Sequence, residues 1–214
     1  MLTTKMHTEK KAISLIVAGL LPKFGIGFEG QLPWKLKREM RYFRLVTSTA
    51  VAGKKNAVIM GRKTWQSIPP KFRPLPNRIN VVLSRTSSSN AAIQEEVEGS
   101  DTVIADSMSS AIRLLDSEKI DQIFVIGGAE LYNQLLSLPE TEDYSVENIF
   151  LTEITSDKDH AMDAFIQMDN TQWRKASSAA LQGHLEKYEL TGFELENNEE
   201  GDYKYDFTLW QKIK

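Results

Sequence analysis

One acidic residue, Glu39, stands where a helix would otherwise be apolar, and it is well suited to hold a polar ligand. If a helix runs through Leu36, Met40 and Phe43, about 100° of rotation per residue puts Glu39 only about 60° from Leu36. The residue four positions after Glu39 is Phe43, so the carboxylate lacks the simplest ion-pair partner that a helix offers. From the helix alone, two interpretations stay open. The carboxylate is offered to a ligand, or it lies at the edge of the apolar stripe and reaches solvent.

The segment before this helix favours a ligand. Gly25-Ile26-Gly27 and Gly30 admit backbone conformations that other residues resist, and Pro33 and Trp34 bring a stiff turn and a large indole to the helix start. Further upstream, Ala12–Leu21 is a continuous apolar run of strand length, which predicts a strand buried on both faces. A buried strand followed by a glycine-rich loop and a helix is a common ligand-binding corner of α/β proteins.

A second possible site follows Asn56–Met60, which reads as another buried strand. The next residues, Gly61-Arg62-Lys63-Thr64, superficially resemble the end of a phosphate-binding P-loop. They fail that pattern, because Arg62 separates Gly61 from Lys63 and the position five before Gly61 is Asn56 rather than glycine. A helix N-terminus with two cations and a hydroxyl still suits phosphate, and an ordinary basic turn is an equal alternative.

Two further strand ends carry residues suited to an anion. Ser84-Arg85-Thr86 places hydroxyls on both sides of a guanidinium after the predicted strand Ile79–Ser84, although such a segment is more often a solvated turn. Gly127-Gly128 follows the predicted strand Gln122–Ile126 and would let the backbone approach a ligand closely, which is a weak signal by itself. Three such strand ends together indicate a dinucleotide site without a Rossmann glycine motif.

A stiff segment, Ser67–Arg78, contains four prolines that can hold apolar residues and one cation at fixed positions. Arg78 comes just before a predicted buried strand. It could be an ordinary surface arginine, which is the more frequent case, or a planar donor for a carboxylate.

Short apolar runs alternate with helical patterns along most of the chain, which predicts an α/β protein with a mixed, mainly parallel central sheet and helices on both faces. After about residue 149 the pattern changes, and an antiparallel C-terminal hairpin is expected. The expected helices are 36–43, 62–67, 107–117 and 130–138; the expected later strands are 102–105 and 149–154, with 185–195 and 203–210 forming the hairpin; the expected surface loops are 86–99, 138–148 and 196–202.

Composition agrees with a folded enzyme that has no metal centre. The chain has 214 residues, 41% of them hydrophobic, which is enough for one full core, although two small domains would also be allowed. The absence of cysteine excludes disulfides and thiolate metal sites, and His7, His160 and His184 lie in polar stretches that do not suggest a metal cluster. The net charge of -3 gives no general attraction to nucleic acid or membranes. Any anionic ligand must therefore be held by local cations.

Several segments, taken in order, resemble dihydrofolate reductases, and specifically the fungal members of that family. The matching pieces are IVAGLLPKFGIGFEGQLPW, KREMRYF, NAVIMGRKTWQSIPPKFRPLPNRINVVLSR, IFVIGGAELY, FLTEI and DYKYDFTLW. The resemblance implies the dihydrofolate reductase fold and the NADPH-dependent reduction of dihydrofolate to tetrahydrofolate, a step of one-carbon metabolism. It also implies a cytoplasmic monomer that binds antifolate inhibitors, and a cis peptide bond at Gly127–Gly128, with Arg73–Pro74 as a second candidate.

The resemblance assigns roles to individual residues of this chain. The substrate-binding set is Ile16, Val17, Glu39, Met40, Phe43, Ile68, Pro69, Leu75, Arg78, Ile126 and Tyr132. The set that binds NADPH is Ala18, Ile26, Gly30, Gln31, Gly61, Arg62, Lys63, Thr64, Leu83, Ser84, Arg85, Gly127, Gly128, Ala129, Glu130 and Leu131. Many relatives carry an aromatic residue at Met40, so that contact is the least secure.

The resemblance also implies the chemistry. Glu39 accepts the N3 proton and the 2-amino group of a pteridine as a bidentate pair, while hydride moves from nicotinamide C4 to pteridine C6 and N5 gains a proton. No other acid is evident, so water admitted past Leu32 and Trp34 supplies that proton, with Thr152 helping to fix the carboxylate. For Trp34 and Thr152 the alternative is packing alone.

Two alternatives from other classes use the same fold. A nonenzymatic pterin- or nucleotide-binding protein could discard Glu39, and a ribosylaminopyrimidine reductase would have little need for Glu39 or Arg78. The presence of both residues favours the folate reductase.

The chain is expected to form one domain over 12–214 after a flexible tail over 1–11. Lys10-Lys11 before the apolar run resembles the start of a signal peptide, but the residues after Pro22 offer no small-residue cleavage site, and cleavage would delete a central strand. The run is too short to span a bilayer. Because the chain ends soon after its last strand, no fused thymidylate synthase is expected.

Overall fold

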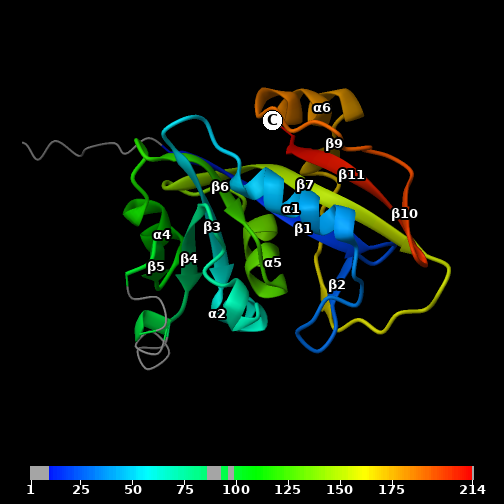
Figure 1. The fold of residues 1–214 in the computed structure, drawn as a ribbon, viewed down its shortest axis with the longest axis horizontal. Helices are drawn as coiled ribbons and strands as arrows, with labels where there is room; N and C mark the ends of the chain where they lie inside the picture. The colour runs from blue at the N-terminus through cyan, green and yellow to red at the C-terminus, as the bar shows by residue number, and fades with distance from the viewer. Residues whose placement is uncertain (1–9, 86–92, 96–98, 214) are drawn as a thin grey trace, which may run out of the picture.

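The computed structural model describes residues 10–85, 93–95 and 99–213. Its centre is an 11-stranded sheet flanked by helices (Figure 1). The strands are β1 (Lys11–Leu20), β2 (Gly25–Gly27), β3 (Lys55–Gly61), β4 (Arg78–Leu83), β5 (Thr102–Ala105), β6 (Ile120–Val125), β7 (Tyr144–Ser156), β8 (Ala164–Phe165), β9 (Trp173–Lys175), β10 (Asn198–Glu200) and β11 (Tyr203–Lys212). The helices are α1 (Lys37–Ser48), α2 (Arg62–Ser67), the 3-10 turn η1 (Pro70–Phe72), α4 (Met108–Leu114), α5 (Ala129–Ser137) and α6 (Ser178–Lys187).

The sheet is mainly parallel, as the alternating pattern predicts. Its order is β10-β11-β7-β1-β6-β3-β4-β5, and every neighbouring pair from β7 to β5 is parallel. Along this path the antiparallel pairs lie at the other end, where β11 joins β7 and β10, and the short strands β2, β8 and β9 also pair antiparallel. The apolar run predicted as a central strand is β1, which lies between β6 and β7. Because the parallel strands end at one edge, the residues that follow them gather there.

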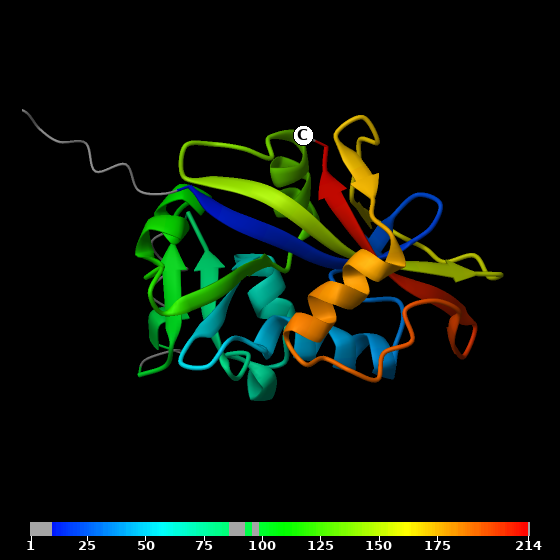
Figure 2. The same cartoon turned by 90° about the horizontal axis from the view of Figure 1, so that it is seen from above.

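Helices cover both faces of the sheet, which confirms that prediction. Alternate residues of β1 divide between two hydrophobic clusters, with Leu15 on the face covered by α4 and α5 and Ile16 on the face covered by α1, α2 and α6. Figure 2 shows α6 and α5 on opposite sides of the sheet. Each large side chain that is fully buried, such as Leu15 or Phe150, stabilises the fold by about 1.5–3 kcal/mol.

The predicted strand over 185–195 is wrong. Residues Ser178–Lys187 form α6 instead, and Ser177 caps this helix by accepting a hydrogen bond from the backbone N–H of Ala180. Leu181 and Leu185, one helical turn apart, are buried against the sheet. The apolar residues that follow, including Leu190, pack against the same cluster from a loop without strand pairing. The C-terminal hairpin exists, but its strands are β10 and β11.

The boundaries of the other elements differ less from the predicted ones. Strand β7 begins at Tyr144, inside the predicted loop 138–148, and β10 lies inside the predicted loop 196–202. Strand β1 begins at Lys11, one residue inside the predicted tail, and the rest of that tail up to residue 9 lies outside the described residues. Helix α4 ends at Leu114, three residues earlier than predicted. Much of the predicted loop 86–99 also lies outside the described residues, and Ile93 within it is buried.

In the part of the chain that the structure describes, no helix is both long enough and apolar enough to cross a lipid bilayer.

Candidate active site

Glu39 lies on the buried face of α1. The helix begins at Lys37, and its buried side chains are Glu39, Tyr42, Val46 and Thr47, spaced by about one turn. Only 7% of Glu39 is exposed, so the interpretation in which it reaches solvent is wrong. Within the described residues, no hydrogen-bond donor or cation pairs with its carboxylate.

Burial changes the proton affinity of this acid. Loss of hydration and, to a smaller extent, the negative charge of Glu200 raise the pKa of Glu39 from 4.5 to about 7. A buried carboxylate with a perturbed pKa and no partner is typical of a ligand-binding or catalytic group.

The loop that leads into α1 is held by contacts from distant segments. Asp163 accepts a hydrogen bond from the backbone N–H of Glu29 (2.8 Å) and donates its own N–H to the carbonyl of Gly27 (3.1 Å). The hydroxyl of Tyr203 donates to the carbonyl of Pro33 (3.1 Å). Sequence reasoning missed both contacts, because Asp163 and Tyr203 lie 134 and 170 residues along the chain from the loop residues that they bind.

Two residues of this loop were expected to control access to the site. Trp34 is 4% exposed, and its indole Nε1 has no hydrogen-bond partner. Leu32 is 50% exposed. Gly30 has a positive φ of 74°, and the Phe28 and Gln31 backbones bond to each other on either side of it.

Two of the three predicted strand ends meet at their glycines. The backbone N–H of Gly61 donates to the carbonyl of Gly127 (2.8 Å), and the Gly127–Gly128 peptide bond is cis, as expected. The bond between Arg73 and Pro74 is also cis, as is Leu21–Pro22, which was not expected.

The hydroxyl of Thr64 faces this glycine pair. A Cβ added to Gly128 would lie 3.2 Å from Thr64 Oγ1, and one added to Gly127 would lie 3.5 Å from it. A side chain at either glycine would therefore fill the space beside the start of α5, where backbone N–H groups suit an anion. The predicted helix that carries Thr64 is α2, in which Arg62 is half-buried and Lys63 is exposed.

The third strand end lies after β4. Ser84 is 4% exposed, and its hydroxyl is buried without a hydrogen-bond partner. The next side chain, Arg85, is 83% exposed and lies 3.5 Å from the carboxylate of Glu130 at the start of α5. This ion pair connects two of the predicted cofactor-binding segments. Thr86 lies outside the described residues.

Arg78 is buried rather than an ordinary surface arginine. It is 4% exposed, and its Nε donates to the carbonyl of Pro76 (3.0 Å) while its Nη1 donates to Thr47 Oγ1 (2.7 Å). Burial and, second, the charge of Arg44 lower the pKa of Arg78 to about 10. The guanidinium remains charged at neutral pH, and its Nη2 has no partner among the described residues.

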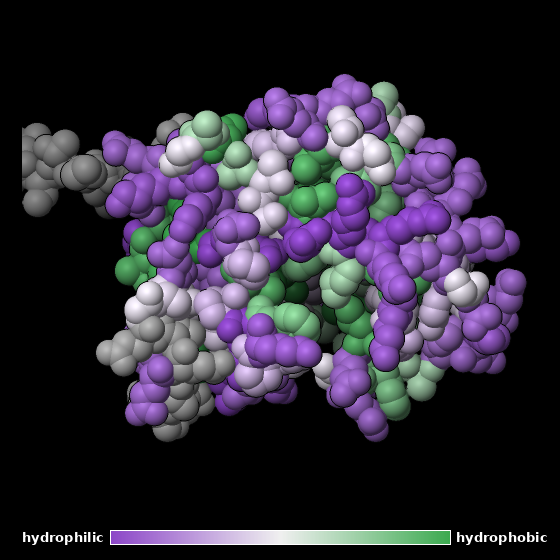
Figure 3. All heavy atoms as spheres, viewed as in Figure 1, coloured by the Kyte–Doolittle hydropathy of each residue, from purple (hydrophilic) through white to green (hydrophobic). Residues whose placement is uncertain are grey.

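Most of the predicted apolar substrate residues lie in one cluster. Figure 3 shows the surface hollowed below α1, with apolar side chains at the rim. The cluster on this face of the sheet includes Ile16, Ala18, Phe43, Ile68, Leu75 and Ile126. The hollow and this cluster together provide apolar walls for a flat ligand.

Other predicted residues lie apart from this cluster. Met40 is 52% exposed and does not share the buried face of α1. Val17 and Tyr132 belong to the cluster on the opposite face, as do Ile26, Leu83 and Leu131. The hydroxyl of Tyr132 nevertheless donates to the carbonyl of Ile16 (2.7 Å), which connects the two sets.

The remaining predicted residues differ in their burial. Thr152 is 2% exposed and pairs with Ala18 across β7 and β1, and no hydrogen bond joins it to Glu39 in the described structure. Pro69 and Glu130 are exposed, and Ala129 is half-buried at the start of α5.

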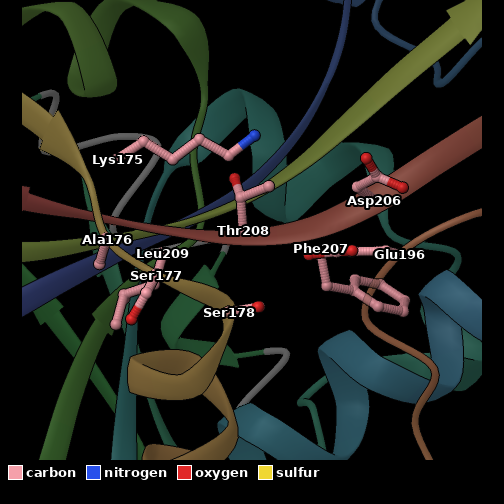
Figure 4. A pocket seen from close by; sticks show the side chains of 9 residues that line it. All are labelled: Lys175, Ala176, Ser177, Ser178, Glu196, Asp206, Phe207, Thr208 and Leu209. Carbon is pink, nitrogen blue, oxygen red and sulfur yellow. The ribbon is translucent and has the colours of Figure 1, made fainter.

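A cavity of about 40 Å³ lies between the start of α6 and β11, lined by residues that include Lys175, Ser177 and Thr208 (Figure 4). It has room for water but is far below the roughly 300–1,000 Å³ of small-molecule sites. No cluster of three or more metal-ligating side chains occurs among the residues described.

Comparison with known proteins gives one consistent result. A family model described as dihydrofolate reductase matches residues 12–211. The dihydrofolate reductase of Candida albicans is 39% identical over 95% of this chain and 98% of that protein. The dihydrofolate reductase of Saccharomyces cerevisiae is 41% identical over 92% of this chain and 95% of that protein. The structure of Schistosoma mansoni dihydrofolate reductase superimposes with a TM-score of 0.70 at 32% identity, covering 94% of this chain and 98% of that one.

Proposed function

This chain belongs to the dihydrofolate reductase family and reduces dihydrofolate with NADPH, and from that premise we propose that Glu39 is the acid that anchors the pteridine. The observation that carries the proposal is a buried carboxylate without a donor among the described residues. The pteridine offers an N3 proton and a 2-amino group side by side. Glu39 accepts both, and the two charge-assisted hydrogen bonds fix the orientation of the ring.

Apolar residues and one cation hold the rest of the substrate. Ile16, Phe43 and Ile126 pack against the flat ring system, and Ile68 and Leu75 pack against the benzoyl group with Pro69 and Met40 at the rim. Arg78 donates to the α-carboxylate of the glutamate tail. Its Nε–H and one Nη1–H are already donated, which leaves the second Nη1–H, both N–H groups of Nη2 and the charge of the group for that carboxylate.

The residues at the three strand ends fit NADPH. The space that a Cβ would fill at Gly127 and Gly128 admits the pyrophosphate, with Thr64, Arg62 and Lys63 as donors. The unpartnered hydroxyl of Ser84 and the exposed guanidinium of Arg85 hold the 2′-phosphate. Gly61, Leu83, Ala129, Glu130 and Leu131 complete this wall, and Ala18, Ile26, Gly30, Gln31 and Tyr132 border the nicotinamide end.

NADPH supplies, when bound, the hydride that reduces pteridine C6. The chain supplies orientation and the control of water. Glu39 holds the ring edge and raises the basicity of N5, and Leu32 and Trp34 admit the water that gives N5 its proton. Thr152 helps to fix the Glu39 carboxylate once substrate is bound. In this proposal N5 takes its proton from that water, and no second acid takes part.

We also infer the working form of the protein. It is a cytoplasmic monomer with one catalytic domain over about 12–214, and it binds antifolates that carry the same pair of donors as the pteridine. Gel filtration with light scattering tests the monomer, and competition between an antifolate and dihydrofolate tests the shared site.

A spectrophotometric assay tests the proposed roles. Oxidation of NADPH should require both substrates and should be nearly lost in Glu39→Gln, with Arg41→Gln on the exposed side of the same helix as the matched control. Equal activity in the two variants would contradict the role of Glu39.

A further inference from the structure

Helix α1, which carries Glu39, begins without a cap of its own. The residue before it, Leu36, has no side chain that can accept a hydrogen bond from the first turn. Glu200 of β10 supplies this cap from the far end of the chain. Its Oε2 accepts the backbone N–H of Lys37 (2.8 Å) and its Oε1 accepts that of Arg38 (3.0 Å).

The capping carboxylate is itself held in place. The hydroxyl of Tyr205, which is 2% exposed, donates to Glu200 Oε1 over 2.5 Å. Partial burial opposes the charge of Glu200, but the hydrogen bonds from Tyr205, Arg38 and Lys37 outweigh it and lower the pKa of Glu200. Glu200 therefore stays ionised at and below neutral pH. An ionised carboxylate at a helix N-terminus also interacts favourably with the helix dipole.

Glu39 directly follows the two residues that Glu200 caps, in the first turn of α1. Lys37 and Arg38 are the first two residues of α1, and Glu39 is the third, so the two hydrogen bonds fix the backbone from which the Glu39 side chain projects. An error of this position by a fraction of an ångström would weaken a bidentate pair with substrate.

We propose that Glu200 is a positioning residue for the reduction, which fixes the first turn of α1 from the C-terminal hairpin and so holds the Glu39 carboxylate against the substrate. The inference rests on the proposed role of Glu39. It adds a residue that touches neither substrate nor cofactor.

Electrostatics support the same connection. The titratable groups that interact with Glu39 are Tyr42 of α1, Tyr132 of α5, Tyr205 of β11 and Glu200 of β10. Burial raises the pKa of all three tyrosines, so they stay neutral through the range in which Glu39 titrates. The charge of Glu200 is thus the one in this group that acts on Glu39, and it makes Glu39 easier to protonate.

The test compares Glu200→Gln with Glu199→Gln. Glu199 lies in the same strand with a 69% exposed side chain, pairs with Lys204 (3.8 Å) and does not cap α1, so the two variants lose the same charge. We expect Glu200→Gln to lower kcat/KM for dihydrofolate about three- to tenfold, because an amide can accept only one of the two N–H bonds. The acid limb of its kcat/KM profile should move a few tenths of a pH unit or more toward lower pH, because the repulsion of Glu39 is lost. Glu199→Gln should show neither change.

Two further variants sharpen the result. Glu200→Asp keeps the charge on a shorter side chain, so its acid limb should remain near that of the wild type. Tyr205→Phe leaves all charges in place and frees one side of Glu200, so kcat/KM should fall while the limb stays. This second variant decides the case if Glu200→Gln does not fold.

Rates are compared per amount of folded protein, measured by circular dichroism. The inference would be overturned if Glu200→Gln and Glu199→Gln had the same kcat/KM and the same acid limb. If Glu200→Gln does not fold, an unchanged kcat/KM in Tyr205→Phe would overturn it. If Glu39→Gln is inactive in the same experiment, only the role of Glu200 has failed. Near-normal turnover in Glu39→Gln would instead reject the proposed function on which the inference rests.

Discussion

Arg78 Nη1 donates a 2.7 Å hydrogen bond to the hydroxyl of Thr47, and that hydroxyl donates its own proton to the carbonyl of Phe43 over 2.7 Å. The guanidinium is therefore tied to the backbone of α1 through one threonine. Because the second bond fixes the direction of the hydroxyl proton, the Thr47 oxygen always presents a lone pair to Arg78. The helix that carries Glu39 thus also orients the cation proposed for the substrate tail.

Replacing Arg78 by leucine should raise KM for dihydrofolate about tenfold to a hundredfold, the range for one hydrogen bond to a charged group. A pterin without the glutamate tail should be affected much less, because it contributes no carboxylate to the pair. Steady-state kinetics with both substrates measure the difference.

Thr47→Val is the matched control for Arg78→Leu. It removes one orienting hydrogen bond and keeps the cation, so it should raise KM for dihydrofolate less than tenfold. Equal losses for dihydrofolate and the tailless pterin in Arg78→Leu would assign Arg78 a purely structural role.

Glu39→Gln should lower kcat by about a hundredfold or more, because an amide cannot accept both donors of the pteridine edge. NADPH binds at other residues, so its dissociation constant should barely change. Cofactor titration by fluorescence together with steady-state kinetics checks both statements. A large loss of NADPH affinity would indicate a disturbed fold rather than a lost anchor.

The pKa of Glu39, raised by burial to about 7, predicts the pH dependence of activity. The ionised carboxylate accepts the two donors, so kcat/KM should fall about tenfold per pH unit below this value and level off above it. The residual activity of Glu39→Gln should not show this fall in kcat/KM at low pH. A wild-type profile that is flat between pH 5 and about 8 would contradict the assignment.

The same acid should make stability depend on pH. Glu39 binds a proton more tightly in the folded chain than in the unfolded chain, so its contribution to stability is complete below pH 4.5 and is lost as the pH rises through about 7. The loss is on the order of 3 kcal/mol at most. Glu39→Gln should therefore gain in Tm relative to the wild type at pH 8 and gain less at pH 5, which thermal melts would show.

Arg85→Ala should weaken NADPH binding about tenfold to a hundredfold and leave NADH binding nearly unchanged, because only NADPH carries the 2′-phosphate. The net charge of -3 cannot supply this preference through the overall field. Both dissociation constants are measured at one salt concentration. Parallel losses for the two cofactors would place Arg85 away from the 2′-phosphate.

Glu130→Gln complements Arg85→Ala, because it removes the other member of the same ion pair. Glu130 pairs with Arg85 at 3.5 Å, and both side chains are more than four-fifths exposed, so the pair itself adds little stability. Removing the acid should free the guanidinium and leave NADPH affinity equal to or better than that of the wild type.

The position of Glu39 could be predicted from the sequence because helical periodicity and the missing partner at Phe43 are local signals. The same holds for β1, whose apolar run is long and unbroken. The strand predicted over 185–195 is wrong because apolar residues at the end of α6 and in the following loop alternate with polar ones. The capping signal of Ser177 and the alanines of the first turn were available and favour a helix.

Contacts between distant segments could not be predicted in this way. Glu200 and Lys37 are 163 residues apart in the chain, and Glu29 and Asp163 are 134 apart. Such pairs depend on which strands become neighbours, and periodicity does not determine strand order. Burial of Arg78 was also undecided in the sequence, since it requires the position of Thr47 on α1.

The cap on α1 has a consequence for how the protein is made. The ribosome releases the first turn of α1 well before its cap, because Glu200 follows Lys37 by 163 residues and Tyr205 comes later still. Until then, the first turn of α1 has only water at its N–H groups, and β7 lacks its neighbour β11. A nascent chain stalled before the hairpin would carry every residue proposed to contact the substrate and still hold its anchoring acid on a frayed helix. Catalytic competence would thus wait for the synthesis of the C-terminal hairpin.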